Sequence, residues 1–178
     1  CSIIFTFNFT FFSLFSTHNR SNSRITPIKD VIKTINKIEK YRIDMACIFC
    51  DILDGKRGAH IVYEDEEHIA FLDKYPIDDG HTLVIPKKHY ERITDMNSND
   101  VGKIFSLVPK IAKGVLSGAG ADAFSLAQNN GKAAKQIIPH VHIHIIPRYN
   151  NKGTVWTKRQ IPTDEVLSQL AQKIKTSI

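Results

Sequence analysis

Three histidines alternate with apolar residues in the stretch IIPHVHIHIIPR, residues 137–148. Successive side chains of a β-strand point to opposite faces, so His140, His142 and His144 would share one face. The valine and isoleucines between them would share the other face. Neighbouring histidines would lie roughly 6.5–7 Å apart, close enough for two of them to bind one metal ion or to flank one phosphorus atom. The pattern predicts a strand with one face in the core and one face in a site.

The residues alone leave three interpretations of this histidine row. A solvent-exposed polar strand is one, although three histidines in strict register beside Asn129 and Gln136 are unusual for it. A catalytic metal site is the second, with His81 joining two of the row and one position left open. The sequence has no HExxH motif, acidic metal cluster or Walker loop to support that site. A phosphate site is the third, because the preceding loop NNGKAAKQ offers Gly131 and backbone amides to phosphate oxygens.

The length and charge of the chain limit its class. The 178 residues, 42% of them hydrophobic, suffice for one well-buried domain. Residues 1–44 hold seven basic and three acidic residues, which leaves 17 basic and 15 acidic residues for 45–178. So small an excess gives little support to a nucleic-acid partner. Three cysteines make no disulfide framework, so we expect a reducing, cytoplasmic compartment.

Residues 1–44 differ in character from the rest of the chain. They contain six of the ten phenylalanines and no acidic residue before Asp30, and their opening stretch, residues 1–24, is too short and too polar to span a membrane. The chain begins at Cys1, and its first methionine is Met45. We expect residues 1–44 to be a disordered or partly helical leader, with organellar targeting open, or a mis-extended reading of the message. The folded domain is expected to be 45–178, with no membrane partner.

The periodicity of residues 45–178 predicts an α+β fold. HIVYED, HIAFLD and HTLVIP read as an antiparallel meander of three strands. From Asn97 a 3.6-residue apolar period predicts a long helix that has Ser98 as its N-cap and is bent at Pro109. AFSLAQ and QIIPHVHIHIIPR are predicted strands, the latter the longest, and residues 164–175 a C-terminal helix. Helices in this arrangement would pack on an antiparallel sheet.

The motif CIFC, residues 47–50, can be read in three ways. A redox dithiol would need it at the entrance of a helix in a βαβ unit, which the antiparallel pattern disfavours. Free cysteines are also common as buried apolar residues. With His89 and His140, the two cysteines would complete a closed tetrahedral zinc site, although the spacings are not those of a zinc finger.

The motifs CIFCDI, AFLD, GHTLVIPKKH, NNG and HVHIHII occur in that order over about residues 47–148. This order resembles the histidine triad family of nucleotide hydrolases. It is most similar to the Hint-like branch, whose members hydrolyse nucleoside phosphoramidates, and to the zinc-bearing microbial members of that branch. The resemblance implies an α+β fold whose sheet continues across a homodimer, and hydrolysis through a nucleotidyl-histidine.

By position, the resemblance assigns roles to individual residues. It implies that His142 is the nucleophile and that His144 hydrogen-bonds the phosphate. Asp73 would hold the ribose. The residues alone allow an equally simple reading, in which Asp73 is a turn residue at the end of a strand. The remaining implied positions are Ile52, Phe71, Leu72 and Lys74 around the nucleoside, Asn129, Lys135, Gln136 and Ile137 at the phosphate, and Cys47, Cys50, His89 and His140 at the zinc ion.

Three positions depart from the family pattern. An apolar residue is usual at Lys74, glycine is frequent at Lys135, and a hydroxyl residue that assists the leaving group is frequent at Ile137. We nevertheless predict a homodimeric purine nucleoside phosphoramidase that releases AMP and an amine, with structural zinc and no other cofactor. The alternatives are a dinucleoside polyphosphate hydrolase that uses the same histidine and a nucleotide-binding interaction module without turnover.

Overall fold

The computed structural model describes residues 27–30, 32–33, 47–157 and 161–178. The chain divides into two compact units, Cys1–Ile38 and Glu39–Ile178. Most of the predicted leader, residues 1–44, and its boundary at Met45 lie outside the described residues, so both stay predictions. Within the described ranges, no helix is long and apolar enough to cross a membrane.

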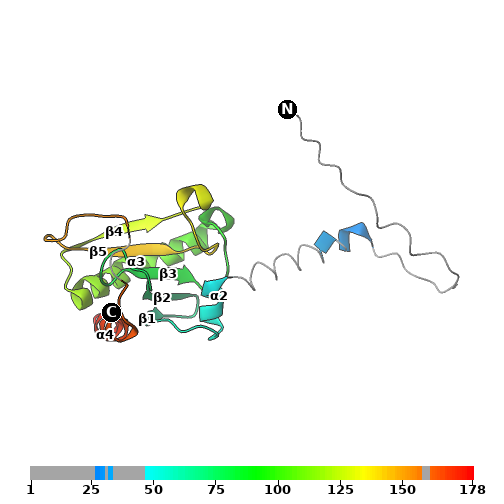
Figure 1. The fold of residues 1–178 in the computed structure, drawn as a ribbon. Helices are drawn as coiled ribbons and strands as arrows, with labels where there is room; N and C mark the ends of the chain where they lie inside the picture. Colours follow the sequence, from blue (N-terminus) through cyan, green and yellow to red (C-terminus); the bar gives the residue numbers. More distant parts are fainter. Residues whose placement is uncertain (1–26, 31, 34–46, 158–160) are drawn as a thin grey trace, which may run out of the picture. The chain divides into compact units, whose positions relative to one another are not determined.

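The second unit contains a five-stranded sheet in the order β1-β2-β3-β5-β4, with every neighbouring pair antiparallel (Figure 1). The meander is formed by β1 (Ile61–Glu64), β2 (His68–Leu72) and β3 (Thr82–Pro86), as predicted. Next to β3 lies β5 (Ile143–Arg148), and β4 (Ala123–Gln128) forms the far edge. The predicted α+β class is confirmed.

Strand β5 begins later than predicted. The sequence suggested a strand from Gln136, but the chain bends through residues 138–140, where the His140 amide donates to the Ile138 carbonyl. Pro139 lies in this bend and has no amide hydrogen to donate to a sheet. His140 and His142 therefore precede β5, and only His144 lies within it.

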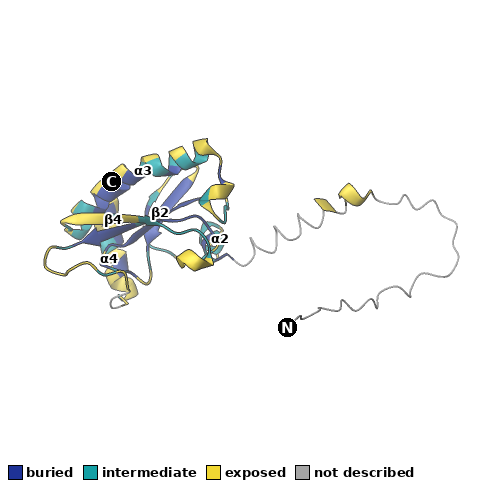
Figure 2. Ribbon diagram, turned by 90° about the horizontal axis from the view of Figure 1, so that it is seen from above, coloured by how far each residue is buried: buried dark blue, intermediate teal, exposed yellow. Residues whose placement is uncertain are grey.

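Two helices cover one face of the sheet (Figures 1 and 2). Helix α3 (Ser98–Ala119) is one continuous helix that includes Pro109, and α4 (Asp164–Lys175) matches its predicted range. The N-cap of α3 is Asn97, not Ser98, because the Asn97 side chain accepts the amide of Asp100. Between these helices and the sheet lies the main core, formed by Val62, Ala70, Leu72, Val84, Met96, Ile104, Val108, Ile111, Ala112, Val115, Val141, Ile143, Ile145, Leu167, Ala171 and Ile174.

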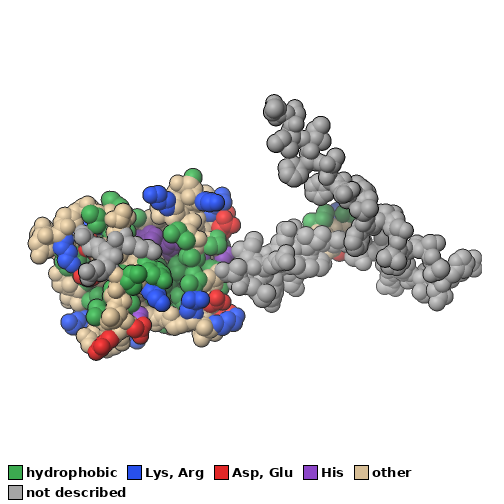
Figure 3. Space-filling view, in the orientation of Figure 1, with side chains coloured by type: hydrophobic (Ala, Val, Ile, Leu, Met, Phe, Trp, Pro, Cys, Tyr) green, Lys and Arg blue, Asp and Glu red, His purple; other side chains and the backbone are tan. Residues whose placement is uncertain are grey.

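The opposite face of the sheet is covered only in part. The short helix α2 (Ile48–Leu53) packs there in a second, smaller apolar cluster. The buried members of this cluster are Cys47, Phe49, Ile69, Phe71, Leu83 and Ile85. Beside the cluster, histidine side chains reach the surface and are bordered by hydrophobic side chains (Figure 3). The fold thus leaves the predicted site accessible from this side.

Candidate active site and metal centre

The geometry around His142 fixes which of its ring nitrogens carries the proton. Nδ1 of His142 lies 2.6 Å from the carbonyl oxygen of His140. A carbonyl oxygen can only accept, so Nδ1 must carry the hydrogen and donate it. Nε2 is then unprotonated, and its lone pair is available to attack an electrophile.

A second histidine pair fixes the proton of His144. The Ile77 amide donates to Nδ1 of His81, at 3.2 Å, so the hydrogen of the His81 ring is on Nε2. That Nε2 lies 3.0 Å from Nδ1 of His144 and donates to it. The proton of His144 is therefore on its own Nε2, where it can be donated to a phosphate oxygen.

Burial keeps these histidines neutral. It lowers the pKa of His81 to about 3, with Arg148 and His142 adding to the effect, and lowers the pKa of His144 to about 3, with His142 and His81 adding to it. Burial also lowers the pKa of His142, against the hydrogen bond to the His140 carbonyl, which raises it. Near pH 7 the row therefore presents neutral imidazoles, which is the form that a nucleophile requires.

The same contacts weigh against a catalytic metal in this row. Asp73, His81 and His144 offer ligand atoms within 4.8 Å of one another, and Asp73 Oδ2 lies 3.3 Å from His81 Nδ1. However, the lone pair of His81 Nδ1 accepts the Ile77 amide, and the lone pair of His144 Nδ1 accepts the His81 proton. Because both Nδ1 lone pairs already accept a hydrogen, the geometry supports a hydrogen-bonded chain better than a metal site.

The predicted nucleoside residues are only partly brought together. Phe71 packs in the smaller cluster. Asp73, two positions further, contacts His81 and so borders the face of the sheet that carries His142 and His144, which we call the histidine face. Ile52 is half-buried against the same cluster, and Lys74 is exposed. Leu72 points the other way, into the main core under α3 and α4, so its side chain cannot contact a nucleoside on this face.

Phe49 is a residue of this site that the sequence reasoning missed. Its ring centroid lies 5.4 Å from that of His142 and 5.4 Å from that of Phe71, with edge-on geometry in both contacts. It also packs at 5.9 Å against the ring of His140. The available signal was its position between the two cysteines of CIFC, which ties it to any metal centre formed there.

The predicted phosphate loop, residues 129–137, follows β4 and leads into the histidine row. Gln128 pairs with Ile143 at the end of the β4–β5 ladder, which brings Asn129 to the level of His142. The Gln136 side chain fastens the loop, since its Oε1 accepts the Gly131 amide and its Nε2 donates to the Glu91 carbonyl, both at 2.6 Å. Lys135 is exposed, and Ile137, at 81% exposure, lies open to solvent.

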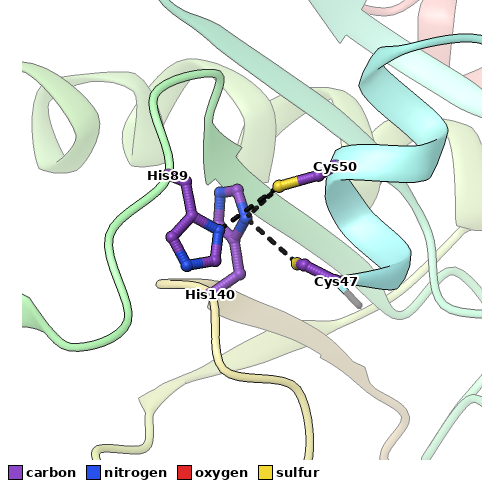
Figure 4. Close-up of side chains that lie close together, drawn as sticks. All are labelled: Cys47, Cys50, His89 and His140. Carbon is purple, nitrogen blue, oxygen red and sulfur yellow. Dashed lines mark hydrogen bonds between the residues drawn. The ribbon is translucent and has the colours of Figure 1, made fainter. Parts of the chain in front are cut away.

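Cys47, Cys50, His89 and His140 converge as predicted, with ligand atoms within 4.8 Å of one another (Figure 4). The Sγ–Nδ1 separations are 3.5 Å for Cys47–His140, 3.3 Å for Cys50–His89 and 3.7 Å for Cys50–His140. Zinc–ligand bonds of about 2.3 Å to sulfur and 2.0–2.1 Å to nitrogen put tetrahedral S and N ligands about 3.5 Å apart. The four donors fit a zinc ion.

Protonation at this centre also suits a metal. Nε2 of His140 lies 2.8 Å from the Pro86 carbonyl and must donate to it, which leaves the lone pair of Nδ1 directed to the cysteines. Burial raises the pKa of the Cys47 thiol, but contacts with His140 and His89 outweigh it and lower the pKa to about 5. The direction of this shift favours the thiolate, which is the form that binds zinc.

Comparison with known proteins identifies the family. A family model described as the HIT domain matches residues 55–151, more than half of the chain. An uncharacterized HIT-like protein of Methanocaldococcus jannaschii is 44% identical over 127 residues, which are 70% of this chain and 98% of that protein. The chain belongs to the HIT (histidine triad) family.

Two further relatives refine this placement. The adenosine 5'-monophosphoramidase of Schizosaccharomyces pombe is 35% identical over 137 residues, covering 74% of this chain and 100% of that protein. A crystal structure of a Zn-bound histidine triad family protein from Mycobacterium smegmatis is similar with a TM-score of 0.66 and 36% identity, covering 75% of this chain and 96% of that one. The chain lies in the Hint-like branch, as the order of its motifs predicts.

We predict that protein purified without chelators carries about one zinc ion per chain, measured by elemental analysis. Structural zinc contributes on the order of 10–16 kcal/mol of apparent binding energy in small peptides, so chelation should visibly lower the melting temperature. Cys50→Ser should lose most of the zinc, whereas His60→Gln, a histidine outside the four, should keep it. A parent protein with less than about a tenth of an equivalent would contradict the site.

His81→Gln should destabilise the protein near pH 7, but the difference should shrink as the pH falls. Folded His81, with a pKa of about 3, binds no proton at pH 5, while the unfolded chain, with a pKa of about 6.5, does. Lowering the pH from about 6.5 towards 3 therefore favours unfolding of the parent through this residue, whereas glutamine binds no proton. Urea unfolding at pH 7 and pH 5 measures the difference; an equal deficit at both would refute the neutral, buried His81.

Proposed function

We propose that the protein hydrolyses purine nucleoside 5'-phosphoramidates to a nucleoside monophosphate and an amine. The observation that carries this proposal is the tautomer of His142, whose Nδ1 donates to the His140 carbonyl and whose Nε2 is left as a free nucleophile. Similarity to a relative named adenosine 5'-monophosphoramidase supports the substrate class.

The reaction proceeds in two displacements. Nε2 of His142 attacks phosphorus, the P–N bond breaks, and the amine leaves with a proton from solvent. Water then attacks the phosphorus of the nucleotidyl-histidine, releases the nucleoside monophosphate and restores the imidazole. Nε2–H of His144 stabilises the charge on the phosphate oxygens, as a preorganised donor does. The amides of Gly131, Ala134, Lys135 and Gln136 donate within the loop and are not counted among these donors.

The zinc ion has a structural role in this proposal. Two cysteines and two histidines form a closed set of four ligands, with no position left for a catalytic water. The ion would fix His140 and α2, which contact His142 through the His140 carbonyl and the Phe49 ring. Cys47 and Cys50 form no disulfide, which suits a reducing compartment such as the cytoplasm.

A side-by-side assay tests the proposed function against its alternatives. Adenosine 5'-phosphoramidate and diadenosine polyphosphates are offered separately to the parent protein, and AMP release is followed. We expect the phosphoramidate to be turned over with the higher kcat/KM. A reversed preference would identify a dinucleoside polyphosphate hydrolase, and AMP binding with no turnover of either would identify a nucleotide-binding module.

His142→Ala should abolish turnover while AMP binding and the zinc content are retained. The reason is that the alanine removes the nucleophile but leaves the His140 ring, the Pro86 contact and the phosphate loop in place. Calorimetry with AMP and elemental analysis report on the two retained properties. A variant that still turns over within about tenfold of the parent would show that another group is the nucleophile.

We further propose a homodimer formed through the edge strand β4. On this strand Phe124 and Leu126 are two positions apart and so share one face, with 39% and 43% of their surface exposed. An edge strand with exposed apolar side chains presents unpaired backbone groups and favours pairing with another chain. A second copy in antiparallel register would continue the sheet.

Leu126→Lys should convert the dimer to a monomer in light scattering at micromolar concentration, because the pairing would bury the new charge. The matched control is Val166→Lys, which places the same charge on an exposed apolar position of α4. A Leu126→Lys variant that remains dimeric would place the interface elsewhere.

A further inference from the structure

Lys135, at the end of the 3-10 helix η2 (Lys132–Ala134), has an unusual backbone conformation. Its φ is +61° and its ψ +29°, and it is the only residue other than glycine with a positive φ in the described part of the chain. Glycine adopts this left-handed conformation without steric cost, whereas a lysine is strained in it. Backbone strain at the border of a candidate active site suggests that the residue has a function there.

The loop that carries Lys135 is held firmly. Gln136 accepts the Gly131 amide and donates to the Glu91 carbonyl, and the Asn130 side chain accepts the Ile93 amide at 2.9 Å. These bonds join loop 129–137 to the segment before α3. The loop therefore presents its exposed side chains from a fixed backbone.

The exposed charged side chains of this loop are all positive. Lys132 and Lys135 are both exposed, and residues 128–138 contain no acidic residue. The Arg92 side chain lies against Gly131, 3.9 Å from the position of an added Cβ, and its charge is partly matched by Glu91 at 3.1 Å. Figure 3 shows Lys and Arg side chains at the top of the histidine face, around the position of η2 in Figure 1.

The course of the reaction determines which group meets these charges. Attack by His142 from the sheet requires the leaving group to depart in line, away from the sheet and towards solvent. Loop 129–137 borders that exit, because Asn129 lies at the level of His142 and the loop runs on directly to His140. A charge on the departing amine would thus pass the loop that carries Lys132 and Lys135.

We infer that the site selects leaving groups that carry a negative charge, such as amines bearing a carboxylate, over neutral or cationic amines. Lys132 and Lys135 supply the attraction. This inference rests on the proposed phosphoramidase function and deepens it by naming the class of amine.

The test compares two adenosine phosphoramidates of equal chain length, those of β-alanine and of n-propylamine, which end in a carboxylate and in a methyl group. The expected result for the full-length protein is a higher kcat/KM for the β-alanine compound. Each exposed charge pair is worth roughly 1.5- to 5-fold, so the double variant Lys132→Gln/Lys135→Gln should lower this ratio about two- to 25-fold. Raising the salt to about 1 M, where charges are screened within about 3 Å, should lower the parent's ratio in the same direction.

A matched control separates this local effect from net charge. Lys110→Gln/Lys113→Gln removes the same two charges from exposed positions on α3, which covers the opposite face of the sheet, and should leave the ratio unchanged. An unchanged ratio in the loop variant, with both substrates slowed equally, would show that the lysines serve only the shared phosphate and would overturn the inference. Absence of turnover with either compound in the parent would instead refute the proposed function.

Discussion

The candidate site depends on the hydrogen bond from His142 Nδ1 to the carbonyl oxygen of His140. His140 takes part in two structures at once. Its ring faces Cys47 and Cys50 with Nδ1 and donates to Pro86 with Nε2, while its backbone oxygen sets the tautomer of His142. Anything that moves His140 therefore changes the direction in which the lone pair of the proposed nucleophile points.

Burial provides a second constraint on the same residues. The imidazoles of His81, His142 and His144 are neutral because the surrounding protein disfavours their charged forms, which lowers their pKa values. Neutral rings can pass a fixed pattern of donors and acceptors from the Ile77 amide through His81 to His144. His144, the proposed phosphate donor, is thus oriented by the Ile77 amide through two successive hydrogen bonds.

The sequence predicted the parts of this molecule that follow a regular period. The meander, α3, α4 and the shared face of the histidines come from periods of 2 and 3.6 residues. The four candidate metal ligands were grouped by the chemistry of two cysteines and two histidines, the family resemblance implied the same set, and they converge in the structure. What it did not predict depends on contacts distant in sequence. An example is the edge-on packing of Phe49 on His142. Leu72 is a different case: strand alternation alone places it opposite Phe71, but the family resemblance grouped both residues around the nucleoside. The N-cap was missed because Asn97 and Ser98 are both good caps and only the side-chain geometry distinguishes them.

The late start of β5 has a consequence for how such a site can arise. Within a regular ladder, the carbonyl of every second residue is bonded to each neighbouring strand, so a strand continuing back through His140 would engage its oxygen in the sheet. The bend at 138–140 frees that oxygen, and it turns to the ring of His142 instead. An interruption of secondary structure by one proline thus supplies a hydrogen-bond acceptor that no side chain had to provide. Substitutions that straightened this segment would lengthen β5 but would remove the acceptor for His142 Nδ1. A more regular strand would therefore orient the proposed nucleophile less well.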